Sequence, residues 1–405
     1  MSAKNKYLFP LIVMASLFFL FGFITTMNNS TIEFLKGAFG LNDVQKQLPN
    51  TFFYGAYVLS VPVGFLIKRI GYRFSIFTGL GLIALGFFAS IPGVGFGYYG
   101  FLSAVSIFAI GVVVLQVAAA PYVVALGPAE SSASRLTLTN ALNSVATVIA
   151  PIFVSVLLVT PELAPGEILE NSAIKDIVKN PFIGIGVVTV VILVIMFFLH
   201  LPDIKGEQKA AEEASKTKHK SSAFKYPHVW LGSLAIFVYM GIEIGIPSFF
   251  ADFANKTGAV IGTSTTDMLK FYWGGLMVGR LIGIFVLQKA KPSLILSICA
   301  IGGAAMLTGA IVLTGNVSMW LFLGTGLFHS IMWPVIYSLA LEDLGPHSDV
   351  ASGIIATSVI GAAILMPIMG AIQTITGSVI IAVSCLFVYY LYLIFFATKG
   401  SKIRT

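Results

Sequence analysis

The chain has few charged residues. Asp, Glu, Lys and Arg make up 10% of its 405 residues, whereas hydrophobic residues make up 57%. Because soluble globular proteins carry about 25% charged residues, this composition excludes a soluble domain. The two cysteines, Cys299 and Cys385, both lie in apolar runs, so we expect no disulfide and infer nothing about redox compartment. The alternating ten-residue segments of a membrane β-barrel are also lacking.

Deep polar side chains are equally scarce. Glu243 is the one carboxylate well inside an apolar run, and His329 is the one histidine in such a place. A membrane-embedded enzyme would need paired carboxylates or a histidine-rich metal site. We therefore expect no enzyme, no bound metal and no cofactor other than a possible coupling ion, H⁺ or Na⁺. A repeated filter motif, typical of an ion channel, is lacking too.

Long apolar runs dominate what is present. Runs near or above about 18 residues indicate membrane-spanning helices, so the sequence predicts an all-α membrane protein with 12 transmembrane helices. The first run follows Lys4 and Lys6 but has no obvious small-residue cleavage site, and we expect it to be retained. The predicted spans are 7–32, 50–70, 74–95, 99–125, 136–160, 180–201, 227–251, 267–288, 292–315, 317–340, 351–374 and 377–397.

Basic residues predict the orientation in the membrane. With the N-terminus inside, 17 of the 24 Lys and Arg residues fall on the cytoplasmic side, and Arg280 lies within a span. This bias predicts that both termini are cytoplasmic. Because the basic residues lie in loops, we expect a lipid bilayer and no nucleic acid as partner. The other six basic residues fall on the opposite side of the membrane; they are Lys36, Lys46, Lys175, Lys179, Lys256 and Lys270.

A polar stretch divides the spans into six and six. Residues 203–226 are rich in Lys, Glu, Ala and Ser, which favours a solvated tether; lipid-surface binding by Lys216, Lys218 and Lys220 is the alternative. The predicted domains are an N-terminal bundle over 1–201, a cytoplasmic linker over 202–226 and a C-terminal bundle over 227–405.

Two polar residues occupy matching places in these halves. Gln116 lies five residues before Pro121 in the fourth span, and His329 lies five residues before Pro334 in the tenth. Intramembrane polar groups usually face a water-filled cavity or a partner. A pair related by internal repetition predicts a central site between two bundles, which is the layout of a transporter.

Several motifs resemble known transporter families. The turn at residues 64–73 is similar to the cytoplasmic signature of the major facilitator superfamily, with Lys68 in place of its acid. Patches in six spans resemble the fucose–proton symporter family, which includes fucose, glucose/galactose and N-acetylglucosamine permeases. These patches are Phe18–Gly22, Met27–Asn29, Leu115–Tyr122, Arg135–Leu136 with Asn140 and Asn143–Ser144, Tyr239–Glu243 with Ser248–Phe249, Trp273–Gly275 with Gly279–Arg280, and Ser330–Pro334 with Tyr337–Leu339.

The resemblance implies the major facilitator fold of two six-helix bundles. It also implies a multi-pass protein of the bacterial inner membrane that moves a hexose-type sugar by alternating access as a cation symporter, and we expect a monomer. The alternatives are an uncoupled sugar facilitator and an exporter of another small molecule on the same fold.

This chain departs from the fucose permeases at the positions of their acids. They carry an acid where this chain has Asn29 and another where it has Gln116, and an amide does not take up a proton at physiological pH. Our hypothesis is that Glu243 and His329 approach one another and that one carries the proton, or that Glu243 helps to hold Na⁺. Alternatively, Glu243 only accepts hydrogen bonds from sugar hydroxyls or neighbouring helices.

A sugar requires hydrogen-bonding groups and aromatic faces. Amides facing lipid are disfavoured, so the intramembrane amides are candidate ligands, although some will join helices. Arg280 is expected to pair with backbone carbonyls or to snorkel. The predicted substrate-binding residues are Asn28, Asn29, Gln116, Asn140, Asn143, Glu243, His329, Trp273 and Trp333, with Tyr54 and Tyr57 as further stacking candidates.

Overall fold

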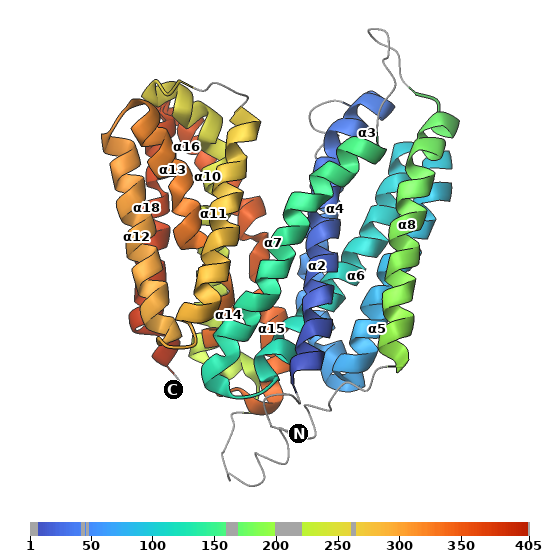
Figure 1. Ribbon diagram of the computed structural model, residues 1–405, viewed down its shortest axis with the longest axis horizontal. Coiled ribbons are helices and arrows are strands. Elements are labelled where there is room, and N and C mark those ends of the chain that lie inside the picture. Colours follow the sequence, from blue (N-terminus) through green and yellow to red (C-terminus); the bar gives the residue numbers. More distant parts are fainter. Residues whose placement is uncertain are drawn as a thin grey trace. The chain divides into compact units, whose positions relative to one another are not determined.

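The structure is a computed structural model that describes residues 7–41, 45, 48–158, 169–198, 221–260 and 265–403. These ranges are helical, with turns between the helices (Figure 1). The chain forms two compact units. Unit 1 comprises Met1–Tyr122 and Leu142–Ala211, and unit 2 comprises Val123–Ala141 and Glu212–Thr405. Residues 202–220 of the expected linker lie outside the described residues.

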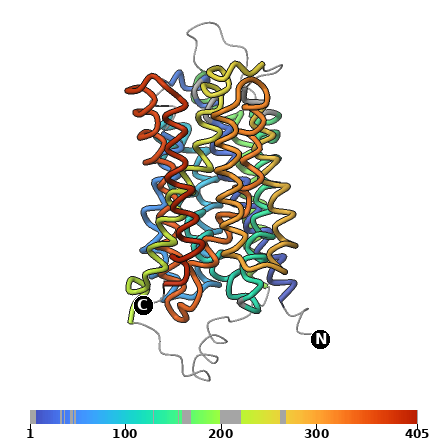
Figure 2. Tube along the Cα trace, turned by 90° about the vertical axis from the view of Figure 1, so that its left-hand side faces the viewer, coloured from blue at the N-terminus to red at the C-terminus, as the bar shows by residue number. Residues whose placement is uncertain are grey.

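In unit 1 the long helices run along a common direction (Figure 2). The α5 helix packs along α8, and α2 contacts the short helices α3 and α4. All of these helices are apolar over most of their surface, as expected for segments surrounded by lipid and by other helices. Their bounds are α2 Leu8–Ser30, α3 Ile32–Phe39, α4 Leu48–Gly55, η2 Ala56–Leu59, α5 Ser60–Gly95, α6 Gly97–Ala125, α7 Ser132–Leu157 and α8 Asn171–Phe198. The end of α6 and the start of α7, within Val123–Ala141, belong to unit 2.

In unit 2 the central helix is α10, which contacts α13, α14, α15, α16 and α18. The α11 and α12 helices both pack against α13. The bounds are α10 Pro227–Thr257, α11 Thr265–Val286, α12 Pro292–Val312, α13 Gly315–His329, α14 Met332–Ala340, α15 Ser348–Thr357, η6 Ser358–Ile360, α16 Gly361–Thr376, α17 Val379–Ser384 and α18 Leu386–Thr398, with short turns η3 Ala129–Ser131, η4 Ala223–Lys225, η5 Gly345–His347 and η7 Gly400–Lys402.

Eleven helical stretches of the described residues are long and apolar enough to cross a membrane. One of them, Leu48–Gly95, covers 48 residues and contains both the second and the third predicted spans. Within it, Gly71 has φ 83° and ψ 166°, which is not helical. Glycine adopts a positive φ without the steric cost that a side chain would add. The break therefore lies inside the predicted turn at residues 64–73.

The predicted tenth span forms two helices, because α13 ends at His329 and α14 begins at Met332. Pro334 explains the break: proline has no N–H to donate to the carbonyl four residues earlier, which belongs to Ser330. The Ser330 carbonyl is thus available for another donor, and the His329 carbonyl lies in the last turn of α13, where helix carbonyls lack an intrahelical donor. In α6, by contrast, Pro121 lies within one continuous helix, so the two matching proline positions differ in local structure.

A glycine stripe brings α11 against this break. A Cβ atom at Gly279 would lie 2.2 Å from the Ser330 Oγ and 2.5 Å from the Leu327 carbonyl oxygen. Gly275 and Gly283 lie one helical turn to either side; Gly275 faces α13, and Gly283 faces Ile331, which lies between α13 and α14. Small residues at four-residue spacing allow helix backbones to approach closely in membranes. The stripe therefore places Arg280, next to Gly279, beside the break.

The first part of α7, up to Ala141, belongs to unit 2. Its Ser132 Oγ lies 2.7 Å from the Ser338 Oγ of α14, and its Ser134 Oγ donates a 2.9 Å hydrogen bond to the Ile284 carbonyl of α11. These bonds join α7 to two helices of unit 2. They also bring Asn140 close to α11.

Candidate functional site

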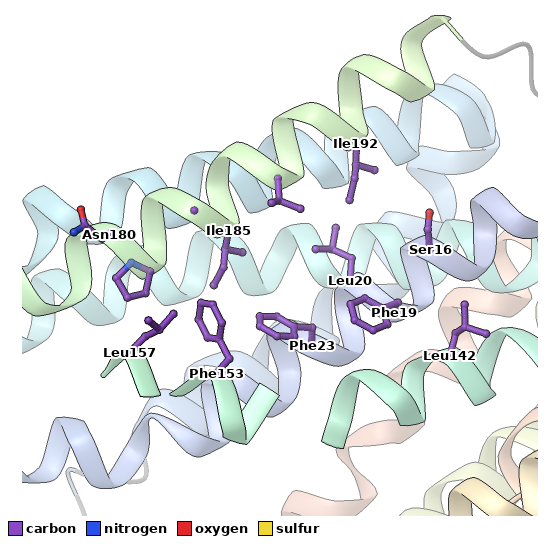
Figure 3. A pocket seen from close by; sticks show the side chains of 13 residues that line it. Ser16, Phe19, Leu20, Phe23, Leu142, Phe153, Leu157, Asn180, Ile185 and Ile192 are labelled. Atoms are coloured by element: carbon purple, nitrogen blue, oxygen red, sulfur yellow. The ribbon is translucent and has the colours of Figure 1, made fainter. Parts of the chain in front are cut away.

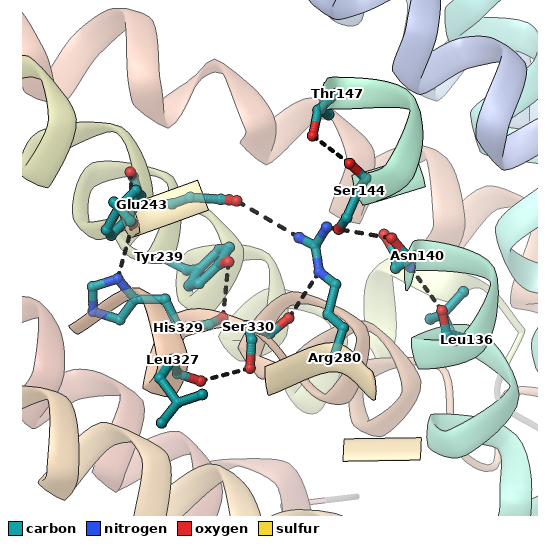
Figure 4. A network of polar contacts seen from close by, with 11 residues as sticks. Leu136, Asn140, Ser144, Thr147, Tyr239, Glu243, Arg280, Leu327, His329 and Ser330 are labelled. Carbon is teal, nitrogen blue, oxygen red and sulfur yellow. Dashed lines mark hydrogen bonds and ion pairs between the residues drawn. The ribbon is translucent and has the colours of Figure 1, made fainter. Parts of the chain in front are cut away.

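A buried ion pair marks the polar centre of unit 2. The Glu243 Oε1 of α10 lies 3.8 Å from the Arg280 Nη2 of α11, and the side chains are only 13% and 9% exposed (Figure 4). A buried charge is costly unless it is paired. Each of these residues therefore supplies the countercharge that the other requires.

Two further nitrogens of Arg280 donate hydrogen bonds to backbone oxygens. Its Nε donates a 3.0 Å hydrogen bond to the Ser330 carbonyl that Pro334 leaves free, and its Nη1 donates a 3.3 Å bond to the Asn140 carbonyl of α7. The expectation that Arg280 pairs with backbone carbonyls is confirmed. The ion pair with Glu243 was not predicted. The sequence did contain an indication of it, because Glu243 and Arg280 carry opposite charges within apolar helices.

His329 is fully buried at the end of α13. Its Nδ1 lies 2.9 Å from the Tyr272 hydroxyl of α11, and its Nε2 lies 2.5 Å from the Tyr390 hydroxyl of α18. The Tyr272 hydroxyl also donates a 2.9 Å bond to the Glu243 backbone carbonyl. The imidazole thus reaches the Glu243 backbone through Tyr272, whereas the Glu243 carboxylate faces Arg280. Sequence analysis did not identify either tyrosine.

The backbone of His329 is engaged as well. Tyr239 of α10 donates a 3.1 Å hydrogen bond to the His329 carbonyl, which the helix break exposes. Tyr239 and Glu243 lie one helical turn apart in α10. Tyr239 therefore links the ion pair to the end of α13.

In unit 1 the two adjacent amides of α2 bind residues of α4. The Asn28 Nδ2 donates a 3.0 Å bond to the Asn50 Oδ1, and the Asn29 Nδ2 donates a 3.3 Å bond to the Tyr54 hydroxyl. Asn28 is buried and Asn29 is exposed. Asn29 consequently presents an amide that is accessible for a ligand.

Gln116 of α6 has a tyrosine partner. The Tyr57 hydroxyl donates a 2.5 Å hydrogen bond to the Gln116 Oε1. The ring of Tyr57 stacks on Tyr54, with centroids 6.4 Å apart and planes inclined by 25°. Gln116 thus belongs to a group of amides and tyrosines on α2, α4, η2 and α6, and this is the combination that sugar recognition requires.

Asn140 and Asn143 bind backbone oxygens. The Asn140 Nδ2 donates a 2.8 Å bond to the Leu136 carbonyl in its own helix, and the Asn143 Nδ2 donates a 3.1 Å bond to the Phe18 carbonyl of α2. A Cβ at Gly22 would lie 2.3 Å from the Asn143 Nδ2, so this bond requires the close approach that Gly22 allows. Asn143 joins two helices in the manner of an intramembrane amide.

The two predicted tryptophans lie against tyrosines of unit 2. Trp273 is half-buried, and its ring meets Tyr272 edge-on at 5.2 Å. Trp333 is buried and stacks on Tyr337 at 4.9 Å. Among the described residues, groups of three or more His, Cys, Asp or Glu side chains that could hold a metal ion do not occur.

Unit 1 also contains an apolar pocket of about 560 Å³ between α2, α7 and α8 (Figure 3). Phe19, Phe23 and Phe153 form one side of it, and the polar lining is limited to Ser16 and Asn180. A sugar site needs several converging polar groups. This pocket is therefore distinct from the amide and tyrosine group.

We expect the Gly184→Leu variant to retain both stability and sugar affinity. Gly184 lines the apolar pocket, and an added Cβ there meets no other atom within 4 Å. Gly111→Leu in α6 is the control, because its Cβ would lie 2.7 Å from the Gly79 carbonyl oxygen and 2.7 Å from the Ile83 nitrogen, and backbone atoms cannot rotate away. Overpacking typically destabilises by about 1–3 kcal/mol, so the melting temperature in detergent should fall only for the control. A rise in the KM for sugar in Gly184→Leu would place the substrate in this pocket.

The chain has two units of apolar membrane-crossing helices. One unit contains a buried ion pair, and the other contains a group of amides and tyrosines. These features define a membrane carrier. Residues 14–367 match the Major Facilitator Superfamily, and the chain belongs to this superfamily. It is 38% identical to the glucose/galactose transporter of Brucella abortus (strain 2308), over 99% of this chain and 96% of that protein. It is 26% identical to the L-fucose-proton symporter of Escherichia coli (strain K12), over 93% of this chain and 89% of that protein.

A solved structure agrees with these relatives. The crystal structure of a Major Facilitator Superfamily transporter, FucP, in the outward conformation has a TM-score of 0.85 and 25% identity, covering 98% of this chain and 99% of that one. The predicted relationship to the fucose–proton symporter family is confirmed, and the protein is a transporter and not an enzyme.

Proposed function

We propose that this protein moves a glucose- or galactose-like hexose across the bacterial inner membrane by alternating access and that protons drive the uptake. The relatives named for glucose/galactose transport support the sugar class. The observation that carries the coupling is the Glu243–Arg280 pair, which places a carboxylate and its countercharge inside the membrane-spanning part of unit 2.

Sugar binding is assigned to the predicted amides and aromatic residues. Asn29 and Gln116, with Tyr54 and Tyr57, offer donors, acceptors and ring faces to a neutral polyol. Trp273 and Trp333 are the proposed stacking surfaces of unit 2. Asn28 and Asn143 join helices through their side chains, and the Asn140 carbonyl accepts from Arg280. For these three residues the proposed role is to support the site.

Glu243 is the proposed proton carrier. At 3.8 Å the Arg280 guanidinium stabilises the carboxylate, and protonation of Glu243 removes that attraction. The guanidinium can then exchange the carboxylate for another acceptor, which would link the protonation state of the carrier to its conformation. The same guanidinium repels Na⁺, so this arrangement favours H⁺ as the coupling ion.

We propose twelve membrane crossings with both termini in the cytoplasm. A straight helix over Leu48–Gly95 would be about 72 Å long at about 1.5 Å per residue, more than twice the roughly 30 Å hydrocarbon core. The break at Gly71 supports two crossings with a cytoplasmic turn. The proposed six-helix bundles are residues 1–201 and 227–405, in a monomer.

Uptake of labelled glucose and galactose into proteoliposomes tests the proposal. An inward proton gradient should drive accumulation, and a Na⁺ gradient alone should not. Equilibration without accumulation would identify an uncoupled facilitator. Absence of uptake or exchange of any hexose would reject the sugar assignment and favour export of another small molecule.

Glu243→Gln should abolish accumulation while sugar exchange continues, because glutamine does not bind a proton. If one proton moves per sugar, a pH difference of one unit drives about tenfold accumulation, and the variant should stay near equal concentrations on both sides. Asp252→Asn is the matched control: this exposed carboxylate of the same helix accepts a 2.7 Å bond from Gln373. A Glu243→Gln protein that accumulates sugar like the control would remove Glu243 from the coupling role.

A further inference from the structure

The hydrogen bonds of His329 form one chain through four helices. They run from the Tyr390 hydroxyl of α18 to the His329 ring of α13, then to the Tyr272 hydroxyl of α11, and end at the Glu243 carbonyl of α10. All four residues belong to unit 2. Both ring nitrogens therefore have a partner.

The carbonyl at the end of this chain determines the direction of every bond. A carbonyl only accepts, so the single O–H of Tyr272 points to the Glu243 oxygen. The Nδ1 of His329, 2.9 Å from the same hydroxyl, must then be the donor. A neutral ring with its proton on Nδ1 has a lone pair on Nε2, and this accepts the O–H of Tyr390.

A positively charged ring fits this chain less well. Its Nε2 would also donate, and the O–H of Tyr390 would have to find another acceptor. Within the described part of the chain, the one hydrogen bond that the Tyr390 hydroxyl makes is to His329. Leaving a buried donor without an acceptor is costly. With the neutral ring, the Tyr272 O–H, the His329 Nδ1–H and the Tyr390 O–H each donate to one acceptor.

We propose that His329 is a positioning residue, held as the neutral Nδ1-protonated tautomer, which fixes the backbone of Glu243 and does not carry the coupling proton. It acts through Tyr272, which holds α10 at Glu243 and lies on the same helix as Arg280. The helix break adds a second link, because the His329 carbonyl accepts from Tyr239 of α10. The functional part of this assignment rests on the proposed coupling role of Glu243.

The tautomer is directly measurable. We expect solid-state ¹⁵N spectra of histidine-labelled protein in lipid to show one neutral ring protonated at Nδ1 among the five histidines, and this signal should disappear in His329→Asn. In Tyr272→Phe the Nδ1 proton loses its acceptor, so the ¹⁵N chemical shift of Nδ1, which depends on that hydrogen bond, should change. Tyr390→Phe is the matched variant, because it removes one hydroxyl oxygen from the Nε2 side of the ring. It should leave the proton on Nδ1. A charged ring or an Nε2 proton in the unmodified protein would overturn the proposal.

Transport by His329 variants separates positioning from proton transfer. Asparagine places an amide nitrogen near the position of Nδ1 and retains the donor to Tyr272, so His329→Asn should keep about tenfold accumulation for one pH unit. His329→Phe keeps a ring but removes both hydrogen bonds, and its KM for sugar should rise about tenfold. If His329→Asn exchanges sugar but does not accumulate it, His329 carries the proton and the proposal is wrong.

The two proposals fail in different ways. If Glu243→Gln still accumulates sugar, the coupling role of Glu243 is lost while the ¹⁵N tautomer of His329 is unaffected. If the ¹⁵N spectra contradict the tautomer, the positioning proposal is lost whatever the behaviour of Glu243→Gln.

Discussion

Replacing Arg280 with methionine should lower stability and abolish sugar transport. The change leaves the Glu243 carboxylate buried without its countercharge, and it removes the donors to the Ser330 and Asn140 carbonyls. Breaking a buried pair by removing one partner costs about 3–5 kcal/mol. We expect a drop of several degrees in the melting temperature in detergent and no sugar uptake by proteoliposomes.

A second substitution distinguishes the lost charge pair from lost packing. In the double variant Arg280→Met with Glu243→Gln the buried charge is gone, so part of the lost stability should return. Lys270→Met is the control for removing a cation from the same helix, because Lys270 is exposed and exposed substitutions usually change stability by less than about 0.5 kcal/mol. A double variant less stable than Arg280→Met would show that the pair is not the reason for the effect.

Adding one methyl group at Gly279 should have the second largest effect. Gly279→Ala places a Cβ 2.2 Å from the Ser330 Oγ and 2.5 Å from the Leu327 carbonyl oxygen. The serine hydroxyl can rotate away, but the backbone oxygen cannot, so α11 and α13 must move apart. Overpacking of this kind costs about 1–3 kcal/mol, and the shift should also lengthen the 3.0 Å bond between Arg280 and Ser330.

Gly274→Ala provides the matched comparison on the same helix. Its added Cβ meets no other atom within 4 Å, and alanine is favoured over glycine in a helix by up to about 1 kcal/mol. We therefore expect the melting temperature to fall in Gly279→Ala and to stay level or rise in Gly274→Ala, with transport lost only in the former. Equal behaviour of the two variants would contradict the close packing of α11 on α13.

The sequence predicted the helices well because the bilayer acts on each segment separately. An apolar run of about 20 residues must satisfy its own backbone in lipid, so hydropathy indicates a span without knowledge of its neighbours. Span 227–251 agrees with α10 at its start, and span 292–315 agrees with α12 to within three residues at its end. The α8 helix begins at Asn171, nine residues before the predicted start, because its first turns are polar and hydropathy does not detect them.

Local breaks were only partly predicted. Gly71 lies in the turn that the glycines and basic residues of 64–73 indicated. Pro334 was recognised as a marker of symmetry, but the end of α13 at His329 was not predicted from it. Its equivalent, Pro121, sits inside a continuous helix, so proline alone does not determine whether a membrane helix is interrupted.

Pairing across helices was the part that sequence analysis missed. It identified Glu243, His329 and Arg280 as unusual, because polar groups in apolar spans are expensive wherever they lie. It did not identify Tyr272 or Tyr390, since tyrosines are common in membrane helices and carry no such signal. The partners of His329 lie 57 and 61 residues away along the chain, a separation that residue spacing does not bridge.

Hydropathy and motifs were sufficient to predict the class of protein, the positions of most spans and the residues whose chemistry is unusual for lipid. These properties follow from the composition of single segments and from motifs shared with relatives. The pairing of Glu243 with Arg280, the position of His329 between two tyrosines and the bond by which Asn143 joins α7 to α2 became known from the packing of the helices. The reason is physical: burial makes a polar group require a partner, but packing selects which partner is within reach.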